Sequence, residues 1–256
     1  MKMLKFRDWI KPEINCLLSK NPMAIQFLEQ NPDKINWKML SLNPTAIHII
    51  ERNLEKVDWG FLSSNPAAIH LLEANPDKIN WNLLSENPAA IHILEKNPYL
   101  ISYRNLCKNP AAIRLIMKKP EQIFWQTLSE NPAAIHLLEQ YPERIDWRNL
   151  SCNPAAIPLL EQNPESIDWM SLSENPAAIR LLESNPEKID WDNLYENPAA
   201  IHLLESNPEK VDWNYLSGNT EIFEYDYKGM TRPFFEELMA NRFHPNNIGK
   251  FEAWGF

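Results

Sequence analysis

The chain has 256 residues and a formal net charge of −9, with 21 prolines and 10 tryptophans but only 5 glycines. Its hydrophobic content of 44% is enough for a core, which excludes global disorder. The acidic balance disfavours nucleic acid and anionic lipid as general partners, and no stretch approaches the ~18–20 uninterrupted apolar residues of a membrane span.

The first 20 residues carry charges throughout and lack the apolar segment of a secretory signal. They end in a partial copy of the repeat that follows, PEINCLLSK. Because the end of a repeat array must be covered, we predict that residues 1–20 form an N-terminal cap. Its apolar residues are Phe6, Trp9, Ile10, Leu17 and Leu18.

A 22-residue unit then repeats without insertion. Asn recurs at positions 21, 43, 65, 87, 109, 131, 153, 175, 197 and 219, and Pro follows it each time except at Thr220. Nine complete units span 21–218. A fixed period of this length is typical of repeat architectures, in which each unit is stabilised by its neighbours.

The unit at 65–86, NPAAIHLLEANPDKINWNLLSE, predicts two short helices. Asn65 is a good N-cap, and Pro66 suits the first helical position. The run 67–73 has helix formers and no strand-like alternation. The residues expected to face inward are Ala68, Ile69 and Leu72, with Leu71 at the flank.

The second Asn-Pro pair ends this first helix, because a residue before Pro is pushed out of the α region. Residues 77–79 leave room for a single 3-10 turn. Asn80 then caps a second helix over 81–85. A leucine-rich repeat is the rival fold, but its LxxLxL strand is absent. The sequence therefore predicts an all-α, short-repeat α-solenoid, which at ~8–10 Å per helix layer would be a rod roughly 80–90 Å long.

One aromatic residue recurs at the start of each predicted second helix. It is Trp37, Trp59, Trp81, Trp125, Trp147, Trp169, Trp191 and Trp213, with Tyr103 in the remaining unit. An exposed ladder of this kind could stack bases or sugars. Apolar neighbours such as Ile79 and Leu84 instead favour a buried aromatic spine between repeats.

Residues 219–256 depart from the repeat and contain nine aromatic residues, from Phe223 to Phe256. Helices are predicted to begin at Pro233, ending near Asn241, and at Pro245. Dense aromatic residues could form a partner site, but we predict a C-terminal cap that seals the last repeat.

The unit NPxAIxLLExNPxKIxWxxLSx resembles the 22-residue repeat present in many copies in proteins of giant DNA viruses of the mimivirus and phycodnavirus kind. The match covers roughly 21–218, and the opening FRDWIKPEINCLLSKNP and the ending that starts IFEYDY also look like theirs. The resemblance implies a viral protein acting in the cytoplasm of an infected cell or packed in the virion. It supplies no catalytic residues. The chain departs from the pattern in units four and five and at Pro158.

Three polar residues recur at fixed positions of the repeat and are candidate sites, namely His, Glu and the leading Asn. His recurs as His48, His70, His92, His136 and His202, and Glu three residues later as Glu29, Glu51, Glu73, Glu95, Glu139, Glu161, Glu183 and Glu205. Equivalent His side chains ~10 Å apart cannot share a zinc ion whose ligands lie ~2.0–2.1 Å away. Eight copies of one Glu argue against a unique acid–base centre. Exposed His, a solvated Glu stripe and Asn residues acting as helix caps are therefore expected.

The chain lacks a Ser-His-Asp arrangement, a phosphate loop and an HExxH motif. Cys16, Cys107 and Cys152 are far apart and form no CxxC pair, which indicates a reducing compartment and neither a disulfide framework nor a metal site. We therefore expect no enzyme activity, cofactor or metal.

The most informative break in the pattern lies between residues 96 and 119. These 24 residues carry a charge of +6 and no Asp or Glu, although the whole chain carries −9. The candidate partner-binding residues are Lys96, Tyr99, Arg104, Lys108, Arg114, Lys118 and Lys119, and Tyr103, Met117 and Phe124 also depart from the consensus. Either surface charge has drifted neutrally here, or the segment is a basic docking band.

The sequence thus favours a non-enzymatic scaffold that binds a viral or host protein. A structural component of the virion is the first alternative. The second is a binder of anionic ligands or nucleic acid through the band at 96–119, which the overall acidity disfavours. No membrane contact is expected, and the sequence does not predict the oligomeric state.

Overall fold

The computed structural model describes residues 4–10 and 17–225. They fall into two compact units: the repeats, within residues 11–221, and a smaller unit containing residues 4–10 and 222–225. Short helices follow one another in a regular 22-residue period, which confirms the all-α, short-repeat solenoid. The helices predicted from Pro233 and Pro245, and Cys16, lie outside the described residues.

Each repeat is numbered here from its leading Asn, which is position 1. In repeat 3, a 3-10 turn at Pro66–Ala68 (η5) leads into α5 (Ile69–Ala74), and a second turn at Pro76–Lys78 (η6) leads to α6 (Trp81–Glu86). The Asn65 side chain accepts the Ala67 N–H at 3.0 Å, and that of Asn80 accepts the Asn82 N–H at 3.1 Å. Both predicted caps and the intervening 3-10 turn are confirmed, while the first helix itself opens as a 3-10 turn.

The same elements recur around the chain. The first helices are α1 (Ile25–Gln30), α3 (Ile47–Glu51), α5, α7 (Ile91–Lys96), α9 (Ile113–Ile116), α11 (Ile135–Gln140), α13 (Ile157–Gln162), α15 (Ile179–Ser184) and α17 (Ile201–Ser206). The second helices are α2 (Trp37–Leu40), α4 (Trp59–Leu62), α6, α8 (Tyr103–Leu106), α10 (Trp125–Ser129), α12 (Trp147–Ser151), α14 (Trp169–Glu174), α16 (Trp191–Leu194) and α18 (Trp213–Leu216).

The 3-10 turns that open the first helices are Pro22–Ala24, Pro44–Ala46, Pro66–Ala68, Pro88–Ala90, Pro110–Ala112, Pro132–Ala134, Pro154–Ala156, Pro176–Ala178 and Pro198–Ala200. Those between the helices are Pro32–Lys34, Pro76–Lys78, Pro120–Gln122, Pro142–Arg144, Pro164–Ser166, Pro186–Lys188 and Pro208–Lys210, and further turns lie at Leu18–Lys20 and Thr220–Ile222. Pro begins nearly all of them because its fixed φ suits a first helical position.

Neighbouring repeats are joined by buried side chains at positions 1 and 21, which we call the Asn–Ser seam. The Asn87 amide donates to the carbonyl oxygens of Ser63 at 3.0 Å and Asn65 at 3.1 Å. The Ser63 hydroxyl accepts the Asn80 N–H at 2.9 Å and donates to the carbonyl of Trp59 at 2.8 Å. From Asn43 to Asn219, each leading Asn caps its own helix and bonds to the two preceding repeats, except that Asn153 bonds only to the Ser129 carbonyl. Capping alone did not predict these bonds.

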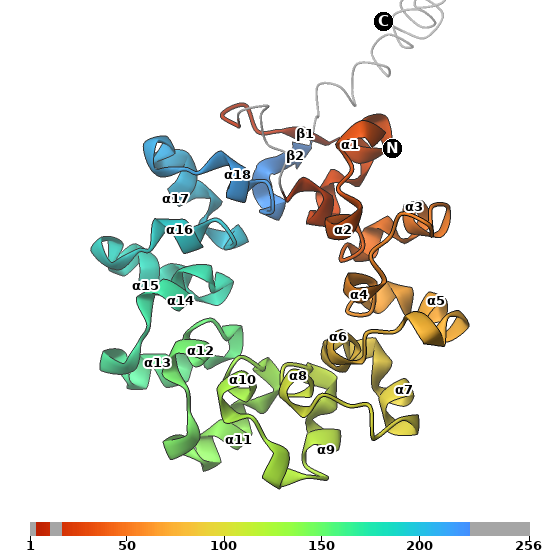
Figure 1. The fold of residues 1–256 in the computed structure, drawn as a ribbon. Helices are drawn as coiled ribbons and strands as arrows, with labels where there is room; N and C mark the ends of the chain where they lie inside the picture. The colour runs from red at the N-terminus through yellow and green to blue at the C-terminus, as the bar shows by residue number, and fades with distance from the viewer. Residues whose placement is uncertain (1–3, 11–16, 226–256) are drawn as a thin grey trace, which may run out of the picture. The chain divides into compact units, whose positions relative to one another are not determined.

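The seam closes on itself. The Asn21 amide donates to the carbonyl oxygens of Ser217 at 3.3 Å and Asn219 at 2.9 Å, and the Leu17 N–H donates to the Ser217 hydroxyl at 2.9 Å. Residues 17–20 and 219–221 therefore stand in place of one further repeat, split between the two ends of the array. The repeat unit is a closed ring (Figure 1), so the prediction of a rod was wrong.

The two helices of a repeat lie on opposite sides of this ring. The second helices form its inner side and the first helices its outer side (Figure 1). Second helices of neighbouring repeats, such as α6 and α8 or α14 and α16, pack directly against one another. Because the outer circumference is longer, neighbouring first helices diverge, and crevices lie between them.

The core is narrow and consists of small and branched side chains. Ala68, Leu72 and Leu84, with their equivalents at positions 4, 8 and 20, are fully buried, whereas Ile69 and Leu71 are half-buried. The predicted aromatic spine is half-buried at every position from Trp37 to Trp213. The prediction of burial was wrong. At Trp37 and Trp125 the reason is visible, because each of these two rings lines an outer crevice between diverging first helices.

The smaller unit contains a two-stranded antiparallel sheet that the sequence did not predict. Strand β1 (Leu4–Phe6) pairs with β2 (Phe223–Tyr225), with Leu4 opposite Tyr225. The Phe6 and Phe223 rings stack with centroids 4.6 Å apart. The two segments predicted as separate caps thus share one sheet. Within residues 4–10 and 17–225, no helix is long and apolar enough to cross a membrane.

Candidate functional site

The crevices between first helices share one construction. The crevice between repeats 1 and 2 has a volume of about 420 Å³ and is lined by Glu29, Trp37, Arg52 and Lys56, among others. The Lys56 ammonium lies 5.0 Å from the centroid of the Trp37 ring. The same contact joins Lys78 to Trp59 at 4.4 Å, Lys188 to Trp169 at 4.5 Å and Lys210 to Trp191 at 4.1 Å. A lysine at position 14 therefore covers the aromatic ring of the preceding repeat.

The His and Glu ladders meet across these crevices. Pairs form between His48 and Glu29 at 2.9 Å, His70 and Glu51 at 2.8 Å, His92 and Glu73 at 2.9 Å, and His202 and Glu183 at 2.9 Å. Both ladders are exposed, as expected, but four of the five His residues at position 6 contact the Glu at position 9 of the repeat before. The exception is His136, which follows Met117. The spacing of 19 residues between Glu and His is the sequence signal for this pairing.

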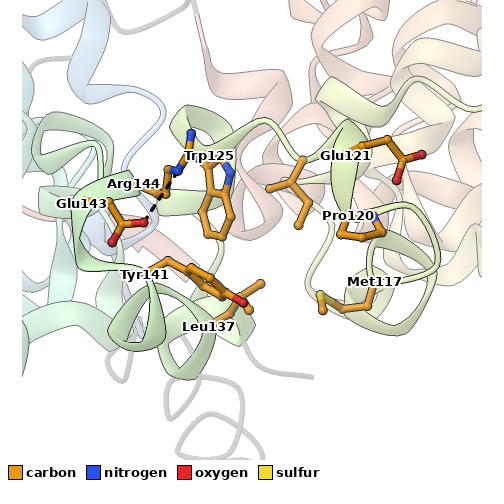
Figure 2. A pocket seen from close by; sticks show the side chains of 9 residues that line it. Met117, Pro120, Glu121, Trp125, Leu137, Tyr141, Glu143 and Arg144 are labelled. Atoms are coloured by element: carbon orange, nitrogen blue, oxygen red, sulfur yellow. Dashed lines mark ion pairs between the residues drawn. The ribbon is translucent and has the colours of Figure 1, made fainter.

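The crevice between repeats 5 and 6 is built differently (Figure 2). It has a volume of about 460 Å³, and Met117 stands where other repeats have Glu. The Tyr141 ring replaces an Asn and lies 5.2 Å from the Trp125 ring, centroid to centroid. Figure 2 shows Trp125 between a wall of Tyr141 and Arg144 and a wall of Met117 and Pro120. Arg144 Nε lies 3.7 Å from a Glu143 carboxylate oxygen.

Large exposed apolar side chains gather in the same part of the ring. Tyr99 is 98% exposed and Phe124 47% exposed. Five such residues fall between 99 and 141, namely Tyr99, Leu100, Met117, Phe124 and Tyr141. They occupy positions 9 to 16, where other repeats carry mainly acidic or amide residues. An apolar and aromatic surface therefore replaces the acidic face in repeats 4–6.

The structure divides the predicted basic band between two sides of the ring. Lys96 ends α7, Arg114 lies in α9, and Lys118 follows α9, so these three belong to the outer side. Lys118 Nζ lies 3.2 Å from a Glu95 carboxylate oxygen. The Lys119 ammonium lies 5.3 Å from the Tyr103 centroid, a contact that takes over the role of lysine at position 14.

Arg104 and Lys108 belong instead to the second helix α8 and the segment after it. Lys108 Nζ lies 3.0 Å from a Glu130 carboxylate oxygen. Burial raises the pKa of Glu86. The charge of Lys108 lowers this pKa in part, and the charge of Glu130 raises it further. Lys108 therefore lies beside carboxylates, and neither Arg104 nor Lys108 lines the outer crevice between repeats 5 and 6.

Two thiols in the described part of the chain have raised pKa values. Burial raises the pKa of the Cys107 thiol, and it raises that of Cys152 to about 11, with Glu130 and Glu174 adding to the effect. Both cysteines are free. Within residues 4–10 and 17–225, no group of three or more His, Cys, Asp or Glu side chains could hold a metal ion.

The chain was compared with protein-family models, curated proteins and solved structures. No protein-family model, no curated protein and no solved structure matches the chain. The residues that line the crevices therefore carry the functional proposal.

Proposed function

We propose that this chain is a non-enzymatic repeat scaffold that binds another protein, and that the outer side of repeats 4–6 is its docking surface. The docking surface consists of Lys96, Tyr99, Leu100, Arg114, Met117, Lys118, Lys119, Phe124, Tyr141 and Arg144. The observation that carries the proposal is the concentration of exposed apolar side chains there, beside basic residues, in an otherwise acidic protein.

The chemistry of this surface suits a protein partner. Aromatic residues, Met and Arg are enriched in protein–protein interfaces, whereas Lys and Glu are depleted in their cores. Water is displaced favourably from exposed apolar patches when a partner covers them. Basic residues at the edge would steer an acidic segment towards the surface. The partner we propose therefore carries apolar anchors flanked by Asp or Glu.

Site-specific photo-crosslinking tests the location. A benzophenone amino acid would replace Tyr99 in one variant and Asp77, at position 13 of repeat 3, in a matched variant. We expect one discrete crosslinked protein from infected cells with the probe at residue 99 and none at residue 77. Equal products at both positions, or none at either, would contradict the docking surface.

Charge reversal tests the role of the basic residues. The triple variant Lys96→Glu, Arg114→Glu and Lys118→Glu should lose capture of the partner identified by crosslinking. The matched control, Arg52→Glu with Arg180→Glu, reverses charge at the same positions 10 and 6 in other repeats. Capture that survives in the triple variant would remove the basic residues from the proposal.

We also propose, from the resemblance of the repeat, that the protein is viral and acts in the cytoplasm of an infected cell or in the virion. High copy number in proteomics of purified particles would favour the alternative of a virion structural component. The nucleic-acid alternative is weakened because Lys108 and Lys118 are paired with carboxylates. It predicts binding that falls steeply with salt, and filter binding at two salt concentrations would detect it.

A further inference from the structure

The interface between repeats 6 and 7 lacks both the lysine at position 14 and the His or Arg at position 6 that most of its equivalents have. Position 14 of repeat 7 is Ser166, so no lysine can cover the Trp147 ring. Position 6 is Pro158, so no base faces Glu139. In the part of the chain that the structure describes, the Glu139 side chain makes no ion pair or hydrogen bond, and no cation lies over the Trp147 ring.

The other interfaces differ from this one in the residues around the aromatic ring and the Glu. Trp37, Trp59, Tyr103, Trp169 and Trp191 are covered by Lys56, Lys78, Lys119, Lys188 and Lys210. Trp81 is followed by Leu100, but the neighbouring Glu73 pairs with His92. At Trp125 the acidic residue is itself replaced, by Met117. Among the eight interfaces between the described complete repeats, only this one keeps Trp and Glu but has neither a lysine over the ring nor a His or Arg at position 6.

The backbone of this interface is the same as in the covered crevices. The Asp168 N–H donates to the Ser151 hydroxyl at 3.0 Å, and the Asp58 N–H donates to the Ser41 hydroxyl at the same distance. Trp147 begins α12 as Trp37 begins α2. The repeat geometry therefore places Trp147 and Glu139 as it places Trp37 and Glu29, which line one crevice together with Lys56.

We propose that Trp147 and Glu139 together bind a lysine or arginine side chain of a partner protein. The chain's own lysines act as internal examples of the ligand, since their ammonium groups lie 4.1 to 5.0 Å from the ring centroids in four other crevices. The charge of the surroundings is complementary. Repeat 7 has no Lys or Arg and carries Glu161, Glu165, Asp168 and Glu174. Trp147 and Glu139 both lie in repeat 6, but neither belongs to the docking surface, and this proposal does not depend on that surface.

The test uses the full chain with indole 15N labelling and two matched probes, Nα-acetyl-lysine methylamide and the neutral Nα-acetyl-norleucine methylamide. The variant Trp147→Phe assigns the Trp147 indole N–H resonance. We expect the lysine probe to shift this resonance roughly two- to five-fold more than the norleucine probe, the equivalent of an exposed cation–π contact. An arginine probe should act like the lysine probe, and added salt should weaken both.

Two substitutions make the test reciprocal. Ser166→Lys supplies the internal cation and should bring the Trp147 responses to the lysine and norleucine probes to the same level. Lys188→Ser uncovers Trp169 and should create a lysine-specific response there. Equal responses to both probes in the parent protein, or a lysine-specific response that survives Ser166→Lys, would overturn the proposal. Because both changes exchange residues already found at position 14, the dispersed spectrum should be retained, and capture at the docking surface is measured separately.

Discussion

The Asn–Ser seam and the outer crevices use the same 22-residue period in opposite ways. Seam residues are buried, and the pattern of bonds made by Asn87 recurs almost unchanged as far as the closure at Asn21. The crevices vary from one interface to the next, from Lys56 over Trp37 to the uncovered Trp147. The comparison indicates that constancy marks what holds the ring together, whereas variation marks where it can bind.

The largest effect is expected in the seam. Asn87→Ala removes an acceptor for the Ala89 N–H and donors to two buried carbonyl groups. The Asn65 carbonyl still accepts the Ala68 N–H at 3.1 Å, so the Ala89 N–H and the Ser63 carbonyl are the groups left unpaired. Each costs about 1–3 kcal/mol, so we expect a loss of about 2–6 kcal/mol in the free energy of unfolding, measured by urea denaturation. Asn75→Ala, which loses one bond to the Leu71 carbonyl at 2.9 Å, is the matched control and should cost about 1 kcal/mol.

The substitution Asn21→Ala tests whether the Asn–Ser seam closes in solution. In a ring its amide bonds to Ser217 and Asn219 and its side chain also caps the Met23 N–H, so the substitution should cost about 2–4 kcal/mol. In an open solenoid only the cap on Met23 would remain, and the cost should fall to the ~1 kcal/mol of a helix cap. A cost of about 1 kcal/mol or less by the same measurement would therefore argue for an open array.

Local structure could be predicted because each repeat carries its own signals. The Asn65 and Asn80 caps, the 3-10 turn after Asn75 and the buried Ala68 and Leu72 all follow from residues within one unit. Closure could not be predicted in this way, since curvature is the sum of small rotations between repeats. The three-residue strands β1 and β2 also lack a local signal, because their partners are more than 200 residues apart.

The candidate site was predicted only in part because the prediction rested on a continuous run of basic residues. The basic run drew attention to residues 96–119, yet Arg104 and Lys108 belong to a different side of the ring from Lys96. Tyr141 and Arg144 were missed because they lie one repeat further on and complete the crevice across an interface. Residues that act together in a solenoid are separated by about one period, and a continuous stretch of sequence does not show this.

In the outer crevices, exchanging the covering lysine should change stability modestly and with opposite signs. Lys56→Ala removes the cation over Trp37 and should lower the free energy of unfolding by about 0.5–1 kcal/mol. Ser166→Lys should raise it by a similar amount at Trp147. If both substitutions lowered stability in urea denaturation, the two crevices would not be equivalent, and the comparison between them would fail.

The smallest effect concerns Glu174 at position 22, beside the seam. Burial raises the pKa of Glu174, and the neighbouring Glu196, Glu130 and Asp190 reinforce the shift. A raised pKa in the folded state means that the folded protein binds the proton more tightly than the unfolded chain. The ionised carboxylate therefore opposes folding above the folded pKa, and the penalty disappears below the ordinary value of 4.5. Glu174→Gln should raise the free energy of unfolding by about 0.2–0.5 kcal/mol at neutral pH, the scale of a like-charge contact. The gain should vanish in acid, and a gain of equal size at both pH values would show that the substitution acts through packing rather than charge.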